Sequence, residues 1–174
     1  MFSINIQNNI VSLKDIEEIQ LESILNWYNM SEDFRFATGM ESPVSLEILA
    51  NKYKQTADSE YEFFLGIHSL YEGKLVGILT GKLTGNILWI NIMAVGLEFQ
   101  GKGYGSISLD LLLKQIIKGN DVREAYLAVV DKNVKGRGFW LRNGFSDIRQ
   151  VDGKVIINGE KYNVIIMKKR LYSR

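Results

Sequence analysis

The chain has 174 residues, of which 46% are hydrophobic and 24% are charged, a composition that excludes disordered, collagen-like and coiled-coil proteins. Its 21 basic and 20 acidic residues leave a formal net charge of +1, so the overall charge gives no attraction to nucleic acid or to an anionic membrane. It has no cysteine and one histidine, His68, which excludes disulfides, thiolate chemistry and zinc sites built on cysteines or paired histidines.

The first third of the chain predicts short strands followed by two helices. Apolar residues alternate near the start, which predicts one or two strands over 2–13, and then recur at helical spacing over 15–29. After a polar and aromatic stretch, Ser42 as N-cap and Pro43 at the first helical position predict a second helix over 43–55.

The middle of the chain predicts antiparallel strands that lead into a glycine-rich turn. Three β-forming segments, 62–67, 74–83 and 86–95, are separated by short glycine-containing turns, the pattern of a meander. The last of them is followed by three glycines within 101–105 and then by a largely apolar helix over 106–118. The third strand therefore delivers a glycine-rich turn directly to the start of a helix.

The last third predicts a buried strand, a short helix and a hairpin. The apolar segment 123–130 is typical of a strand buried on both faces by parallel pairing. A helix over 134–143 has Gly144 where a left-handed cap favours glycine, and the pair at 158–159, Asn-Gly, predicts a type I′ hairpin turn. The whole order predicts a mixed α/β sheet, mostly antiparallel in its N-terminal part, with a central parallel pair and helices on both faces.

We predict that residues 1–174 form one domain, because no repeat, low-complexity stretch or proline-rich linker is visible. The longest apolar run, residues 125–130, is far shorter than the roughly 18 residues that span a bilayer. We therefore expect a soluble cytoplasmic protein without a membrane or nucleic-acid partner.

The glycine-rich turn is the strongest functional motif. A strand followed by such a turn and a helix start exposes backbone N–H groups that can bind phosphate, although an ordinary turn is the alternative for an isolated G-x-G. The P-loop string is absent, and the dinucleotide pattern fails because its third glycine falls on Ser106 or Asp110. The remaining pattern, Gln/Arg-x-x-Gly-x-Gly/Ala, is matched by residues 100–105.

This hexapeptide resembles the signature of the GNAT superfamily of N-acetyltransferases. Residues 93–95 look like the end of the family's fourth strand, and 96–99 look like the loop that leads to its pyrophosphate cradle. Downstream, Asn133 and the string FWLRNGF at 139–145 look like the second signature, an Asn followed by Phe-Tyr/Trp-x-x-x-Gly-Phe. The resemblance is specific over about 87–145 and looser elsewhere.

The resemblance implies a GNAT-like fold in which the central parallel strands splay apart to hold the pantetheine arm of acetyl-CoA. It implies main-chain bonds from Met93 and Val95, and a pyrophosphate on the amides of 101–105 with Gln100 and Lys102 at its edge. No metal is implied. The implied cofactor-binding residues are Met93, Ala94, Val95, Gln100, Gly101, Lys102, Gly103, Tyr104, Gly105, Ser106, Asn133, Phe139 and Trp140.

Several of these residues also have a purely structural interpretation. By resemblance Asn133 would contact the pantetheine, yet it could also cap the helix that follows. Phe139 and Trp140 would flank the thioester, yet they could also anchor that helix to the sheet. Met93 and Val95 suit a core as well as a cofactor.

The implied reaction is direct attack of a primary amine on the thioester of acetyl-CoA, with CoA as product. The Met93 amide could polarise the carbonyl as a preorganised donor. Where many members have a tyrosine acid, this chain has Trp140, whose indole N–H donates a hydrogen bond but supplies no proton near neutral pH. The general acid is therefore unassigned, although a thiolate leaves with little acid assistance.

The general base is unassigned as well, because Trp89 stands where some members carry a glutamate. The candidates left open are Asn91 or Glu98 acting through water, Glu32, Asp33, and His68, which is more simply a surface or capping histidine.

The sequence is compatible with two functions. The first is an N-acetyltransferase acting on an unidentified amine, either of a small molecule or of a protein N-terminus. The alternative is a catalytically weak or inactive acyl-CoA-binding sensor or interaction module, suggested by Trp89 and Trp140. Both a monomer and a homodimer are compatible with the sequence. By resemblance the acceptor would be framed by Trp27, Tyr28, Asp33, Arg35, Phe36 and the turn at 158–159.

Overall fold

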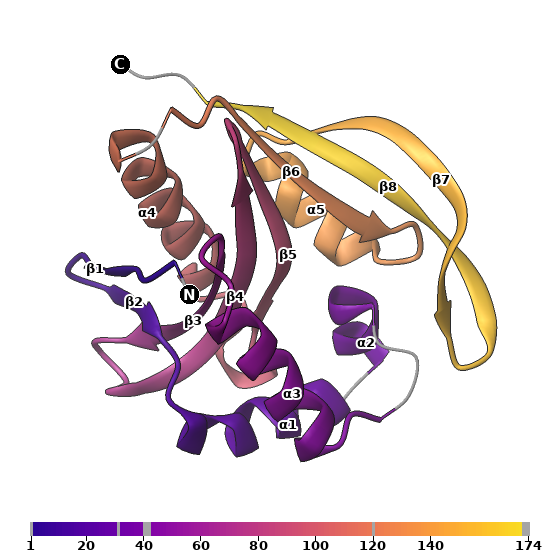
Figure 1. Cartoon of the computed structure of the whole chain (residues 1–174). Coiled ribbons are helices and arrows are strands. Elements are labelled where there is room, and N and C mark those ends of the chain that lie inside the picture. Colours follow the sequence, from indigo (N-terminus) through magenta and orange to yellow (C-terminus); the bar gives the residue numbers. More distant parts are fainter. Residues whose placement is uncertain (1, 31, 40–42, 120, 172–174) are drawn as a thin grey trace.

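The computed structural model describes residues 2–30, 32–39, 43–119 and 121–171 (Figure 1). Within these residues the strands form one sheet in the order β1-β2-β3-β4-β5-β6-β8-β7. The strands are β1 (Asn5–Gln7), β2 (Val11–Asp15), β3 (Glu62–Ser69), β4 (Lys74–Thr84), β5 (Ile87–Val95), β6 (Glu124–Val130), β7 (Ser146–Ile157) and β8 (Glu160–Arg170).

Helices cover both faces of this sheet, as predicted. Figure 1 shows α4 on one face and α1, α2 and α3 on the other. None of the described helices is long and apolar enough to cross a membrane. The helices are α1 (Leu21–Met30), α2 (Glu32–Thr38), α3 (Leu46–Ala57), α4 (Tyr104–Gly119) and α5 (Val134–Arg142), with short 3-10 turns η1 (Glu18–Gln20) and η2 (Leu97–Phe99).

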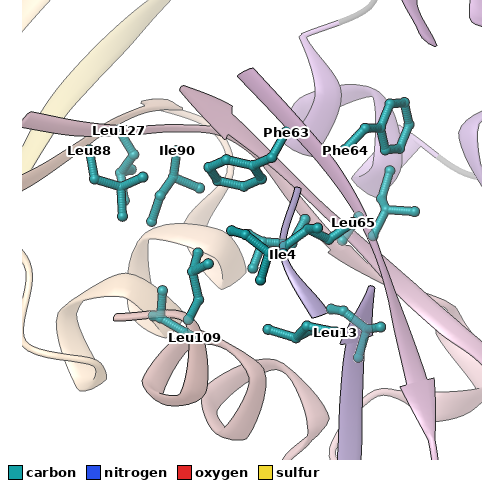
Figure 2. Packing of buried hydrophobic residues seen from close by; sticks show 14 of the residues in the cluster. Ile4, Leu13, Phe63, Phe64, Leu65, Leu88, Ile90, Leu109 and Leu127 are labelled. Atoms are coloured by element: carbon teal, nitrogen blue, oxygen red, sulfur yellow. The ribbon is translucent and has the colours of Figure 1, made fainter. Parts of the chain in front are cut away.

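The apolar core between the sheet and α4 shows which side chains of β5 point toward α4. Leu88 and Ile90 of β5 are buried on the side where Leu109 of α4 packs, as Figure 2 shows. Because side chains alternate along a strand, Trp89 points to the opposite face, where α1, α2 and α3 lie. There its ring stacks on that of Tyr126, with the centroids 6.0 Å apart.

The pairing of β5 with β6 is parallel, whereas all other neighbouring strands in the sheet pair antiparallel. This parallel register runs only from Ile87 to Ile90 of β5, although the strand continues to Val95. On β6 it ends at Leu127, three residues before the end of the strand at Val130. The carboxyl ends of the two strands therefore separate, as the family resemblance implied.

A β-bulge lies where this separation begins. Opposite the shift in β4, Thr80 pairs with Ile92 and Gly81 pairs with Ile90, which leaves Asn91 as an extra residue in β5. A bulge bends its strand and increases the local twist, so it directs the end of β5 away from β6. This bulge was not predicted from the sequence.

The N-terminal helices differ from the prediction in three respects. Asp15 ends β2, so the first helical turn begins at Glu18 rather than at residue 15. The helix α3 is capped by Ser45, whose hydroxyl accepts a hydrogen bond from Ile48 N at 3.2 Å, and Pro43 precedes it. Ser42, the predicted cap, lies outside the described residues. The third difference is α2, which forms in the polar and aromatic stretch where no element was predicted.

The C-terminal hairpin was predicted correctly. Asn158 and Gly159 adopt φ values of 53° and 77°, and positive φ at both central residues defines a type I′ turn. Gly144 likewise ends α5 with a φ of 83°, as expected for a left-handed cap.

Candidate active site

A cleft of about 570 Å³ opens between the separated ends of β5 and β6. Its walls come from β5 and β6 themselves, from the glycine loop that starts α4, from α5, and from α2 on the opposite side. The residues that line it include all the predicted cofactor-binding residues except Lys102, namely Met93, Ala94, Val95, Gln100, Gly101, Gly103, Tyr104, Gly105, Ser106, Asn133, Phe139 and Trp140.

The end of β5 presents main-chain groups to this cleft. Gly96 N donates to Val76 O at 2.9 Å on β4, and Val95 stands opposite Gly77. In an antiparallel ladder the backbone groups of successive residues point to opposite sides, so Val95 directs its N–H and C=O away from β4, as does Met93 two residues earlier. The Val95 carbonyl accepts a hydrogen bond from Gln100 Nε2 at 3.0 Å.

The glycine loop presents backbone donors next to these groups. Gly101 and Gly103 have φ values of 78° and 85°, conformations that L side chains rarely adopt. Ile107 N donates to Gly103 O at 3.1 Å, so the N–H groups of residues 104–106 belong to the first turn of α4 and have no intrahelical acceptor. Together with the positive end of the helix dipole, these N–H groups form a site for an anion such as a phosphate.

The loop approaches the second signature closely. A Cβ atom at Gly105 would lie 3.1 Å from the ring of Phe139 and 3.8 Å from the methyl group of Met93. A side chain at this position would therefore crowd the point where α4, α5 and β5 converge.

Aromatic residues of α5 form the wall next to the loop. Trp140 is buried and lies between two other rings, with its centroid 5.0 Å from Phe139 and 5.2 Å from Phe145, both edge-on. Asn133 caps α5, since its Oδ1 accepts a hydrogen bond from Gly136 N at 2.8 Å. Asn133 thus has the helix-capping role that was the alternative to a contact with the cofactor, and it also lines the cleft.

Lys102 is directed elsewhere. Its Nζ lies 2.9 Å from Glu72 Oε1 and 5.5 Å from the ring centroid of Phe99. The hydrogen bond from Lys102 lowers the pKa of the Glu72 carboxyl. Lys102 therefore ties the glycine loop to the turn between β3 and β4.

The candidate bases are scattered. Asn91, at the bulge, lines the cleft, whereas Glu98 is exposed and does not. His68 lies on β3 beside Gln20, 3.0 Å from its side-chain nitrogen, and its pKa is lowered by burial and by Lys14. The side chains of Glu32 and Asp33, on α2, lie outside the description.

The wall formed by α2 is joined to the C-terminal hairpin. Arg35 Nη1 donates to Asn158 Oδ1 at 3.0 Å, and the Phe36 ring packs edge-on against Tyr162 with centroids 5.4 Å apart. Phe34, Phe36 and Ala37 line the cleft. Of the other residues expected around the acceptor, Trp27 and Tyr28 are buried in α1 and do not line it, and burial raises the pKa of Tyr28.

Comparison with known proteins places this geometry in a family. The model of the acetyltransferase (GNAT) family matches residues 21–145. The chain is 26% identical over 113 residues to the spermine/spermidine N(1)-acetyltransferase of Bacillus subtilis (strain 168), which covers 60% of this chain and 72% of the relative. The probable spermine N(1)-acetyltransferase of Bacillus subtilis subsp. natto (strain BEST195) matches with the same identity and coverage.

Solved structures share the fold over nearly the whole chain. The spermidine N-acetyltransferase from Vibrio cholerae in complex with CoA and spermine has a TM-score of 0.79 at 20% identity, covering 94% of this chain and 97% of that one. The acetyltransferase from Salmonella typhimurium that modifies the N-terminal serine of ribosomal protein L7/L12 has a TM-score of 0.81 at 15% identity, with 95% and 97% covered. The chain therefore belongs to the GNAT acetyltransferase family, as its motifs predicted, and is an acetyl-CoA-dependent N-acetyltransferase.

Proposed function

We propose that this chain transfers an acetyl group from acetyl-CoA to the primary amine of a small molecule or of a protein N-terminus. The observation that supports this most directly is the free edge of β5. Beyond Ile90 no strand among the described residues pairs with β5 in parallel, and Met93 and Val95 direct main-chain groups toward the cleft. An elongated amide-containing arm could pair with this edge as a strand would.

The residues fit the phosphates of CoA as well as its arm. Backbone N–H groups of residues 104–106 and the dipole of α4 favour an anion at the glycine loop. Lys135 and Arg142 of α5, the charged side chains among the described residues that line the cleft, favour the negative charge of the phosphates. Asn133 and Phe139 would contact the arm near the thioester, and Gln100 would stay at the edge of the cradle.

For the chemistry, acetyl-CoA supplies the acetyl group as a thioester. The Met93 N–H would donate to the carbonyl oxygen, whose negative charge grows during attack. Trp140 would close the reacting centre against water and could donate its indole N–H. The thiolate that leaves has a pKa near 8.5, so the chain does not need a strong proton donor here.

The acceptor is the open part of the proposal. The Bacillus relatives are named for spermine and spermidine, and the Salmonella neighbour for a protein N-terminal serine, so an amine is common to all of them. A catalytically weak acyl-CoA sensor is the second candidate. It is favoured by Trp140 in place of a proton donor, and by the lack of a carboxylate among the described side chains that line the cleft.

Thermal unfolding with acetyl-CoA, CoA, NADH and ATP in parallel tests the cofactor. At a hundredfold excess over Kd a native-state ligand adds about 2.7 kcal/mol, which is about 5 to 10 °C for a domain of this size. We expect such a shift with acetyl-CoA and CoA and little change with the other two. Release of free thiol with a panel of amines then separates the enzyme from the sensor. Binding without any thiol release would favour the sensor.

A further inference from the structure

The wall of the cleft formed by α2 differs in chemistry from the wall that faces the glycine loop. On α2 the cleft is lined by Phe34, Phe36 and Ala37, and Ala128 lies nearby on β6. The charged lining residues, Lys135 and Arg142, both come from α5 and both are cationic. Among the side chains that the structure describes, no carboxylate lines the cleft.

This lining is poorly suited to a polyamine. Such a molecule carries further ammonium groups besides the one that reacts, and an ammonium withdrawn from water needs an anionic or polar partner. Phe34 is only 2% exposed, so the α2 wall offers mainly the Phe36 ring and the Ala37 methyl group, which favour an apolar body. The neighbouring Arg35, held by Asn158 at 3.0 Å, adds positive charge on the same side.

The junction between α2 and the hairpin also bears on the size of the acceptor. Figure 1 shows α2 between the sheet and the tip of the β7–β8 hairpin, and two contacts bridge them, Arg35 to Asn158 and Phe36 to Tyr162. The bridge ties α2 to the hairpin, so an extended peptide could pass between them only if both contacts broke, whereas a compact molecule need not cross them.

We propose that the acceptor is a small monoamine whose amino group is carried by an aromatic or aliphatic body, and not a polyamine. The inference rests on the proposed function and deepens it. Apolar surroundings disfavour an ammonium, so the pocket itself would favour the neutral, nucleophilic amine and take over part of the role of a base. The amine nitrogen forms a bond to the acetyl carbon, the carbon–sulfur bond breaks with its electron pair on sulfur, and one amine proton passes to water.

The test compares amines of different body and charge on the full chain. Phenethylamine, hexylamine, spermidine and a tetrapeptide with a free N-terminal serine are assayed for thiol release from acetyl-CoA, and each is also tested for binding to CoA-saturated protein by thermal shift. We expect phenethylamine or hexylamine to exceed spermidine in kcat/KM by about tenfold or more, because spermidine would leave ammonium groups unpaired.

Substitutions at Ala37 test the same idea inside one protein. Ala37→Asp places a carboxylate on the α2 wall, and Ala37→Asn is the matched control with nearly the same shape and no charge. Relative to the Asn variant, the Asp variant should raise the ratio of spermidine to phenethylamine kcat/KM by about fivefold, the size of one exposed ion pair. Glu32→Gln and Asp33→Asn, at the start of the same helix, should leave the wild-type order of the amines unchanged.

The outcomes separate the two proposals. If spermidine has the highest kcat/KM of the four amines, and if this preference is lost in Glu32→Gln or Asp33→Asn, the monoamine inference is overturned and acetyl transfer stays intact. The highest value for the peptide would also overturn it. If no amine releases thiol, a thermal shift with phenethylamine but not with spermidine would support the monoamine site while acetyl transfer fails. The absence of that shift would overturn the monoamine inference too.

Discussion

The two walls of the cleft are built from different kinds of groups. On the side of β5 and α4 the functional groups are backbone amides and carbonyls, held by the bulge at Asn91 and by glycines with positive φ at 101 and 103. On the side of α2 they are side chains, such as Phe36, held by contacts to a hairpin more than a hundred residues away. Under the proposed function, the first wall would bind the cofactor that the family shares, and the second would face the acceptor, which differs between the relatives.

The two walls leave different signals in the amino-acid sequence. A backbone site requires particular residues at particular spacings, because only glycine combines positive φ with close approach. A side-chain site can be built from many residues on several elements, so it leaves no fixed spacing. Substitutions on the two walls should accordingly have separable effects.

The largest effect is expected from Gly103→Val. A β-branched residue at a φ of 85° is strongly disfavoured, so the loop would rearrange and its N–H groups would no longer converge. The loss of about two charge-assisted hydrogen bonds corresponds to about 3 kcal/mol, or a roughly hundredfold increase in the Kd of CoA. Isothermal titration with CoA measures it directly.

Gly85→Val is the matched control for this prediction. Gly85 has a φ of 57° and open space around its Cβ position, and it lies in the turn before β5, at the end of that strand far from the cleft. The variant should lose thermal stability for the same backbone reason and keep its affinity for CoA. Equal losses of affinity in both variants would mean that general destabilisation accounts for the result.

A smaller effect, confined to the acceptor, is expected from Phe36→Ala. Removing this ring from the α2 wall should raise the KM for the amine by about tenfold, the value of a lost aromatic contact, and should leave the Kd of CoA unchanged. Tyr162→Leu is the control, since it removes the ring contact of the hairpin and leaves Phe36 in place. If that control reproduced the full effect, Phe36 would act through the hairpin and not on the acceptor.

The sequence predicted the backbone wall far better than the side-chain wall. Residues 100–105 could be aligned with a known signature, and the hairpin turn could be predicted because Asn158 and Gly159 suit positive φ. The bulge at Asn91 could not be predicted, because its cause is the register between β4 and β5, which depends on both strands. The direction of Lys102 could not be predicted either, since its partner Glu72 is thirty residues away in sequence.

Arg35 and Phe36 were expected around the acceptor, but the helix α2 that carries them was not predicted, for a related reason. The helix is only seven residues long, too short to show a helical period, and isolated helices of that length are unstable in water. What supports it is packing against β5 and β6 and the contacts of Arg35 and Phe36 with the hairpin. Such tertiary support has no local signal in the sequence.

A still smaller effect is expected at the reacting centre from Trp140→Phe. This variant keeps one aromatic ring among Phe139 and Phe145 and removes the indole N–H together with part of the ring volume. Because the leaving thiolate is already stable near neutral pH, kcat should fall by about threefold, the value of one neutral hydrogen bond. Measured by thiol release at saturating acetyl-CoA, a loss of a hundredfold or more would instead make the Trp140 N–H essential to the reaction.

The smallest catalytic effect is expected from His68→Gln, which lies on neither wall. The pKa of His68 in the folded protein is lowered, chiefly by burial and then by Lys14, against weaker opposing effects from the backbone of Gly66 and from Glu17. As the pH falls below about 6.5 the unfolded chain takes up this proton first. The folded state thereby loses stability as the pH falls from 6.5 through the lowered pKa, and it has its full stability above 6.5.

The His68→Gln variant should therefore show a flatter dependence of the unfolding temperature on pH below 6.5, with unchanged kcat/KM at pH 7.5. Scanning calorimetry from pH 7.5 to 5, together with one rate measurement, tests both expectations. Glutamine retains a polar side chain beside Gln20, which contacts His68 at 3.0 Å in the wild type, so the comparison isolates the titration. A fall in kcat/KM with an unchanged stability profile would return His68 to the candidates for the base, and the two walls would then no longer account for the chemistry by themselves.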